Sequence, residues 1–163
     1  MNRRGNVALA IVAWVPFLIF VCARIVMDVN FDRNIEGHLK LAADSSSIEL
    51  AIDELKIATA AMEAYPAGFT SIIYNTPDES VTFWIKNTKT CLNQLEVIPK
   101  TASLMDKNSS LLKARQILLD HKSNGESVTS PAGISIYPFN LLWTIFGTLT
   151  ICFGVAGFIV AAR

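Results

Sequence analysis

Two long apolar runs lie at the ends of the chain, and a segment in which apolar and polar positions alternate with a helical period separates them. The last run, residues 138–162, is uncharged and is followed directly by Arg163. The first run, residues 7–27, contains Arg24 as its one charged residue. A helix needs roughly 20 apolar residues to cross the hydrocarbon core of a bilayer. We therefore predict two transmembrane helices on either side of a central domain, residues 28–137.

Small residues recur in the last apolar run at alternating spacings of three and four, which places all of them on one stripe of a helix. In lipid no hydrophobic effect draws helices together, so close packing over small side chains carries much of the association. The stripe is predicted to be a helix packing interface, toward other membrane protein subunits or copies of this chain. Its members are Gly147, Thr150, Gly154, Gly157 and Ala161.

The first apolar run has two interpretations. Arg3 and Arg4 precede it, and Val21-Cys22-Ala23 ends in a small residue, as in a cleavable secretory signal peptide. Its length and flanks favour an uncleaved membrane anchor. Small residues crowd its beginning, as they crowd the end of the last run, so we expect the two helices to approach most closely near the chain termini.

Charge is divided sharply between the ends and the middle. All 14 acidic residues lie between Asp28 and Glu126, and residues 28–137 carry ten Lys or Arg, a net charge of −4. The short tails, residues 1–6 and 163, are basic, and basic tails favour the cytoplasmic side. We predict an inner (plasma) membrane protein with both termini in the cytoplasm and a periplasmic or extracellular central domain. Three residues are predicted to lie at the outer interface: Arg24, Tyr137 and Trp143.

An apolar seam with a three-four spacing begins the central domain. It runs from Ile48 to Tyr65 and predicts a helix. Leu50 and Ile57 lie beside the seam and are expected to widen its buried face. We favour one long helix over residues 31–65, continuing out of the membrane. The alternative is a break at the serine triplet, where Ser46 and Glu49 could form a capping box.

Two further helices are predicted. Thr76 is a suitable N-cap, with proline following it and Glu79 placed to close a capping box, so a helix should start there and end before Pro99. Another should run from about residue 102 to 120. The β-branched and aromatic residues 69–74 are isolated, and a single strand has no partner, so we expect a buried connector. The fold class is therefore all-α: two transmembrane helices flanking a small extracytoplasmic helical bundle.

Chemical motifs are sparse. Alternating oxygen side chains from Asp28 to Glu36 are reminiscent of a calcium loop, but Arg33 and Leu39 stand where such a loop needs glycine and a bidentate acid. His38 and His121 are the only histidines and belong to no zinc motif. No catalytic, metal or cofactor site is predicted, and an acidic domain disfavours nucleic acid as a partner.

Aromatic residues gather around the predicted connector. They could line a ligand pocket, but in a small bundle such side chains are more often the core, because a small domain needs large side chains to bury enough area. The residues are Tyr65, Phe69, Tyr74, Phe83 and Trp84. Cys91, the one cysteine of the central domain, lies on an apolar helix face and is predicted to be buried.

Parts of the central domain resemble a known family. The segment from Thr70 to Asn87, with Glu36-Gly37-His38-Leu39-Lys40 and Ala42-Ala43-Asp44 before it, is similar to a family of small two-span bacterial membrane proteins of uncharacterised function. The resemblance covers most of the central domain. It implies a compact module between two spans and no particular activity.

Two classes of function fit these patterns. The first is a non-enzymatic membrane protein that acts through helix packing as an accessory subunit or scaffold of a membrane complex. The second is a periplasmic ligand-sensing domain that signals through a separate partner. An enzyme is the weakest hypothesis, because the motif search found no catalytic constellation.

Overall fold

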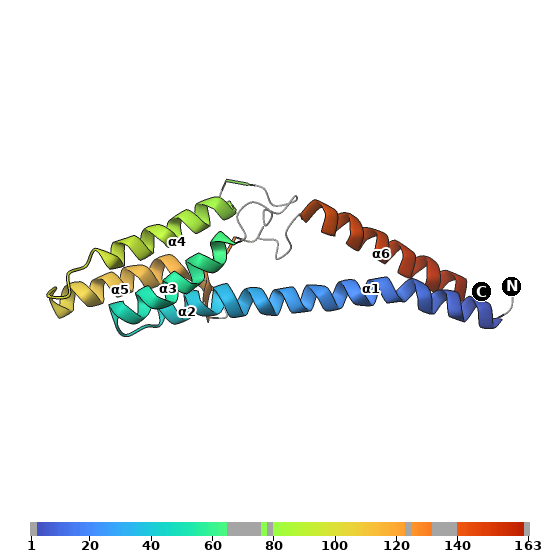
Figure 1. The fold of residues 1–163 in the computed structure, drawn as a ribbon, viewed down its shortest axis with the longest axis horizontal. Helices are drawn as coiled ribbons and strands as arrows, with labels where there is room; N and C mark the ends of the chain where they lie inside the picture. The colour runs from blue at the N-terminus through green and yellow to red at the C-terminus, as the bar shows by residue number, and fades with distance from the viewer. Residues whose placement is uncertain (1–2, 65–75, 78–79, 123–124, 132–139, 162–163) are drawn as a thin grey trace.

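The computed structural model describes residues 3–64, 76–77, 80–122, 125–131 and 140–161. The chain is mostly helical, and its helices form two groups along one long axis (Figure 1). At one end α1 (Arg3–Phe31) and α6 (Asn140–Ala161) lie beside each other and converge toward the chain termini. At the other end lie the helices α2 to α5, which form the small domain.

Two helices are candidates for crossing a membrane. Trp14–Ala43 and Leu141–Ile159 are long and apolar enough, judged by length and composition. Only 6% of the most apolar window of the first, and 22% of that of the second, is buried inside the protein. Core helices of soluble proteins bury their apolar face, whereas these two helices leave most of their apolar residues exposed. Such a surface is expected where lipid rather than water covers a helix.

The first helix continues directly into the small domain. After α1 the backbone forms a π-helical turn, Asp32–Glu36, and then α2, Gly37–Ala43. The Gly37 N–H donates to the Asp32 carbonyl, and a Cβ on Gly37 would lie only 3.0 Å from that oxygen. Glycine thus permits the tight backbone approach of the π turn. The prediction that the helix continues beyond the apolar run holds as far as Ala43.

The helix predicted over residues 31–65 is divided in two. Asp44 ends α2, and α3 spans Ile48–Glu63. Ser47, in an extended conformation, is the N-cap of α3, and its hydroxyl accepts a hydrogen bond of 3.2 Å from the Leu50 N–H. The prediction of one uninterrupted helix over residues 31–65 was therefore wrong. The break falls in the serine triplet, one residue beyond the predicted cap at Ser46, because the cap hydroxyl satisfies an otherwise unpaired N–H of the new first turn.

The predicted seam is the buried face of α3. Its members from Ile48 to Met62 are 6% exposed or less: Ile48, Ala51, Leu55, Ala58 and Met62. Leu50 and Ile57 do not widen this face, since they are 55% and 49% exposed. They lie two turns apart on the side of α3 that points away from the core. Tyr65 falls outside the described residues.

Helix α4, Val81–Glu96, begins later than predicted. Ser80, not Thr76, is its N-cap, and its hydroxyl accepts from the Phe83 N–H at 3.3 Å. Both residues are suitable caps, and the one used directly precedes the buried run Val81, Trp84, Thr88, Cys91 and Leu95. These buried residues recur in the sequence at spacings of three and four, and the predicted burial of Cys91 is confirmed.

A short hairpin follows α5 and corrects the purely helical expectation. Helix α5, Leu104–Leu118, starts at the N-cap Ser103 and ends two residues before the predicted end. Strands β1 (Leu119–Lys122) and β2 (Gly125–Val128) then pair antiparallel, with Leu119 opposite Val128. Gly125 has a φ of +122°, a conformation that favours glycine and allows the chain to reverse.

Helices α2 to α5 share one core. Trp84 bridges it to the segment after the hairpin, because its indole nitrogen donates to the Thr129 carbonyl at 2.5 Å, while the Thr129 N–H donates to the Leu118 carbonyl at 2.8 Å. The fully buried large side chains are Ile35, Leu39, Leu55, Met62, Leu95 and Cys91. Ile35 and Leu39 come from the continuation of α1, so this first helix is part of the domain core.

Candidate functional site

The small-residue stripe of α6 is buried against α1. Among the α6 residues whose side chains are described, four are buried: Gly147, Thr150, Gly154 and Gly157. Among the described elements α1 makes the main contact with α6, so α1 of the same chain lies along the stripe. The side chain of Ala161 is outside the described set.

A close contact between the two helices joins Phe20 to Gly147. A Cβ built on Gly147 would lie 2.6 Å from Cζ of Phe20, closer than nonbonded carbons approach. The Phe20 ring therefore occupies the space that the missing side chain leaves. Gly154 differs, because no described atom lies within 4 Å of its Cβ position.

The Phe20 ring belongs to a cluster of three aromatic rings. The Phe20 ring centroid lies 6.1 Å from that of Trp143 and 6.0 Å from that of Phe146, and the latter two meet edge to face at 6.1 Å. Such geometries are favourable for aromatic pairs. The stripe also satisfies its own polar group, since the Thr150 hydroxyl donates to the Gly147 carbonyl at 2.8 Å.

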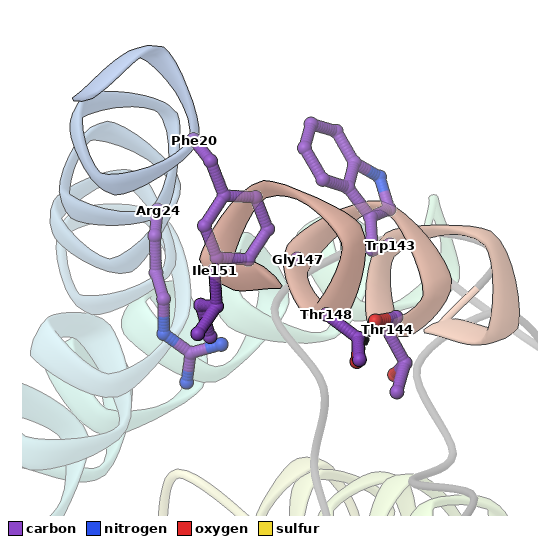
Figure 2. Close-up of a pocket in the computed structure, with 7 residues that line it drawn as sticks. All are labelled: Phe20, Arg24, Trp143, Thr144, Gly147, Thr148 and Ile151. Atoms are coloured by element: carbon purple, nitrogen blue, oxygen red, sulfur yellow. Dashed lines mark hydrogen bonds between the residues drawn. The ribbon is translucent and has the colours of Figure 1, made fainter. Parts of the chain in front are cut away.

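A cavity of about 200 Å³ opens beside these rings, at the end of the helix pair nearest the small domain. Its polar side chains are Arg24, from α1, and Thr144 and Thr148, from α6. Figure 2 shows the Arg24 guanidinium and both threonine side chains directed to one side of α6, with the Phe20 ring over Gly147. The cavity is lined by Phe20, Arg24, Trp143, Thr144, Gly147, Thr148 and Ile151.

The side of α6 away from α1 carries large apolar side chains. They are about half exposed or more and give the helix pair an aliphatic and aromatic outer surface: Leu141, Leu142, Ile145, Leu149, Phe153, Val155, Phe158 and Ile159. Helix α1 shows the same pattern at Ile11, Val12, Val15, Leu18, Ile19, Ile25, Val26 and Val29. On α6 the buried positions are thus small residues, and most of the bulky ones are exposed.

Two residues of the predicted aromatic group, Phe83 and Trp84, are described, and they differ in burial. Trp84 is 7% exposed and packs beside Phe31, with ring centroids 6.5 Å apart. Phe83 is 63% exposed, because it is one position away from the buried face of α4. Tyr65, Phe69, Tyr74 and the interface residue Tyr137 lie outside the described residues.

The titratable residues of the domain make structural contacts. His38 Nδ1 lies 2.6 Å from Glu54 Oε2 and joins α2 to α3. Lys56 and Glu96, 2.9 Å apart, join α3 to α4, and Arg115 pairs with Glu126. Among the described residues no group of three His, Cys, Asp or Glu side chains could hold a metal ion.

Two groups have a raised pKa in this domain. Burial raises the pKa of the Cys91 thiol to about 11, so this cysteine is held as a neutral thiol. Burial also raises the pKa of Glu36, partly offset by a hydrogen bond with Ser130, and the nearby carboxylates of Asp32 and Asp28 add to the rise. Neither environment resembles that of an activated nucleophile, which requires a lowered pKa.

Sequence reasoning found the stripe and Arg24 but missed Phe20, Thr144 and Thr148. The signal for Phe20 is a large ring on one helix facing a glycine on the other, and it can be recognised only once the two helices are aligned. No family model, curated protein or solved structure matches this chain.

Proposed function

We propose that this chain is a non-enzymatic integral membrane protein that serves as an accessory subunit or scaffold of a membrane complex. In this proposal α1 and α6 cross the membrane as a pair, and residues 28–137 form an extracytoplasmic module. The observation that carries it is the burial of the small-residue stripe of α6, with Gly147 packed against Phe20 of α1. This packing would make the two spans one unit on which the domain is mounted.

The orientation rests on charge. The start of α1 and the end of α6 lie at the same end of the molecule (Figure 1). In the sequence Arg3 and Arg4 stand before one apolar run and Arg163 follows the other, and basic flanks of membrane spans favour the cytoplasmic side. The domain, with its net charge of −4, would lie on the opposite side of the membrane.

Partners would bind surfaces other than the stripe. Because α1 already covers the small residues of α6, a second chain would contact the bulky outer faces of the spans or apolar side chains of the domain. Leu50 and Ile57 are the strongest domain candidates, since they are about half exposed on one face of α3.

The test is the mass and composition of the complex after gentle detergent extraction of the tagged, full-length protein from its own membrane. A stoichiometric second protein supports the accessory role, and it should be lost from the variant Leu50→Gln/Ile57→Gln. The matched control is Leu104→Gln/Met105→Gln, which makes the same change at equally apolar, more exposed positions at the start of α5. A protein that is monomeric in every extraction contradicts the proposal.

A ligand sensor is the second candidate, and the unbroken passage from α1 through the π turn into α2 favours it. Ile35 and Leu39 on this passage are fully buried in the domain core, so a change in the domain would be transmitted to a membrane helix. Thermal stabilisation of the full-length protein by one compound of a metabolite panel would support this function. The absence of stabilisation across a broad panel would count against it.

A further inference from the structure

Arg24 is the only charged residue in the apolar run of residues 7–27, where a charged side chain is unusual. Charged side chains inside a membrane are costly and are generally directed toward a protein interior or a polar site. Arg24 lies on α1 and lines the cavity that this helix forms with α6. Its guanidinium is directed to the same side of α6 as the side chains of Thr144 and Thr148 (Figure 2).

The surroundings of this cavity favour an anion. The guanidinium supplies a permanent positive charge and several N–H donors in one plane. The cavity extends along α6 from Trp143 to Ile151.

We propose that this cavity binds the phosphate group of an anionic phospholipid in the leaflet that adjoins the domain. Arg24 would hold the phosphate through paired N–H···O bonds, the geometry that a guanidinium shares with phosphate oxygens. The Thr148 hydroxyl donates to the Thr144 carbonyl at 2.8 Å in the structure, so it would turn about one side-chain bond to donate to the phosphate. The guanidinium is therefore the principal donor.

The walls of the cavity favour a lipid over a free anion. Phe20 and Ile151 form an apolar side of the cavity. Ile25 and Ile145, close by on the two helices, are each about half exposed. Acyl chains attached to a bound phosphate could lie along this aliphatic surface. Trp143, whose ring belongs to the cavity wall, is of a residue type enriched at the level of lipid headgroups.

This inference rests on the proposed membrane insertion and not on the accessory role. A lipid can be tested with the purified chain alone, so failure of lipid binding and failure to find a protein partner are separate results. A volume of about 200 Å³ accommodates a phosphate and the adjoining glycerol atoms but not a complete lipid, whose chains would lie outside.

The experiment measures thermal unfolding of the full-length protein in a neutral detergent with added lipid or salt. The additions are phosphatidylglycerol, phosphatidylcholine or inorganic phosphate at equal concentration. We expect stabilisation by phosphatidylglycerol well above that by phosphatidylcholine, and none by inorganic phosphate. In Arg24→Gln the apparent affinity for phosphatidylglycerol should fall about tenfold or more, because a charge-assisted pair of hydrogen bonds is lost.

Two further variants guard against misfolding of Arg24→Gln. Arg24→Lys keeps the charge but not the paired donors and should bind several-fold more weakly, and Thr148→Val should weaken binding less. The control is Arg33→Gln, which removes the same charge from an exposed position in the π turn. Equal stabilisation by both lipids, or equal losses in Arg24→Gln and Arg33→Gln, would overturn the site. Stabilisation by inorganic phosphate that depends on Arg24 would overturn its assignment to a lipid.

Discussion

The ring of Phe20 lies where a side chain on Gly147 would begin, since a Cβ at that position would be 2.6 Å from the Phe20 Cζ atom. This contact links the middle of α1 to the first half of α6. A glycine of the small-residue stripe on α6 thus accommodates a specific side chain of α1. The aromatic neighbours Trp143 and Phe146 restrict where the Phe20 ring can move.

Substitution of this glycine should disturb the helix pair. In Gly147→Ala the added methyl group forces the Phe20 ring to shift within its aromatic cluster, and overpacking of this kind costs about 1–3 kcal/mol. The measurement is the free energy of unfolding of the full-length protein in a neutral detergent. Gly154→Ala is the matched control, because no described atom lies within 4 Å of its added carbon. Equal losses in the two variants would contradict the fit.

The break between α2 and α3 can be tested at single-residue precision. Ser47→Ala removes the hydroxyl that accepts from the Leu50 N–H, and loss of an N-cap costs about 1 kcal/mol. Ser46→Ala, one residue earlier and exposed, should change stability by less than about 0.5 kcal/mol. Chemical denaturation of both variants gives the comparison. A larger loss in Ser46→Ala would mean that the helix starts at the position that the sequence suggested.

Trp84 should be the most sensitive aromatic residue of the domain. Trp84→Phe removes the donor to the Thr129 carbonyl and part of the buried ring, so we expect a loss of at least about 1 kcal/mol. Phe83→Leu alters a side chain that is 63% exposed and should cost less than about 0.5 kcal/mol. Unfolding of Phe83→Leu can be followed by tryptophan fluorescence, and unfolding of Trp84→Phe by circular dichroism. The reverse order of losses would show that Phe83 belongs to the core.

Cys91 gives the folded domain a dependence on alkaline pH. Its pKa is raised from 9.0 to about 11 by burial, so between these values the unfolded state loses its proton first. The free energy of unfolding should then fall with rising pH, by at most about 1.4 kcal/mol per pH unit from this residue. The measurement is the free energy of unfolding of the natural protein and of Cys91→Ala from about pH 8 to about pH 11, the window that these pKa values define. The difference between the two slopes against pH is the contribution of Cys91. Parallel slopes would contradict burial of the thiol in a neutral form.

Local patterns of the sequence predicted much of the fold, and competing local signals limited the rest. The three-four spacing in α3 and α4 identified the buried faces, because burial in a helix follows its period. The helix starts were less certain, since Thr76 and Ser80, or Ser46 and Ser47, are equally suitable caps. Tertiary packing of Val81 and Ile48 determines which of them is used.

The hairpin after α5 was missed because strand pairing is not local. Leu119-Asp120-His121-Lys122 contains no β-branched residue, and its neighbours read as the end of a helix. The available signal was the Asn-Gly dipeptide at residues 124–125, which is typical of chain reversals, although Gly125 itself pairs with Lys122 in the hairpin. The long helix was overextended for a related reason, since no residue of the serine triplet forbids a helix.

The candidate site was predictable in part. The sequence identified the small-residue stripe but could not say which helix covers it, because a second copy and α1 of the same chain fit the pattern equally. It placed Arg24 at an interface but could not show the cavity that the residue lines with Thr144 and Thr148. Both features depend on the alignment of α1 with α6, which pairs residues more than a hundred positions apart.

Cross-linking in the native membrane tests most directly whether α6 packs against α1 of its own chain. Phe20→Cys and Gly147→Cys are introduced together into a protein whose three natural cysteines are replaced, and a short bifunctional thiol reagent is added. The intact mass of the product then identifies the link. The structure predicts a monomer carrying one bridging reagent. Cross-linked dimers, with both single-cysteine variants also forming dimers, would show that the stripe joins two copies instead.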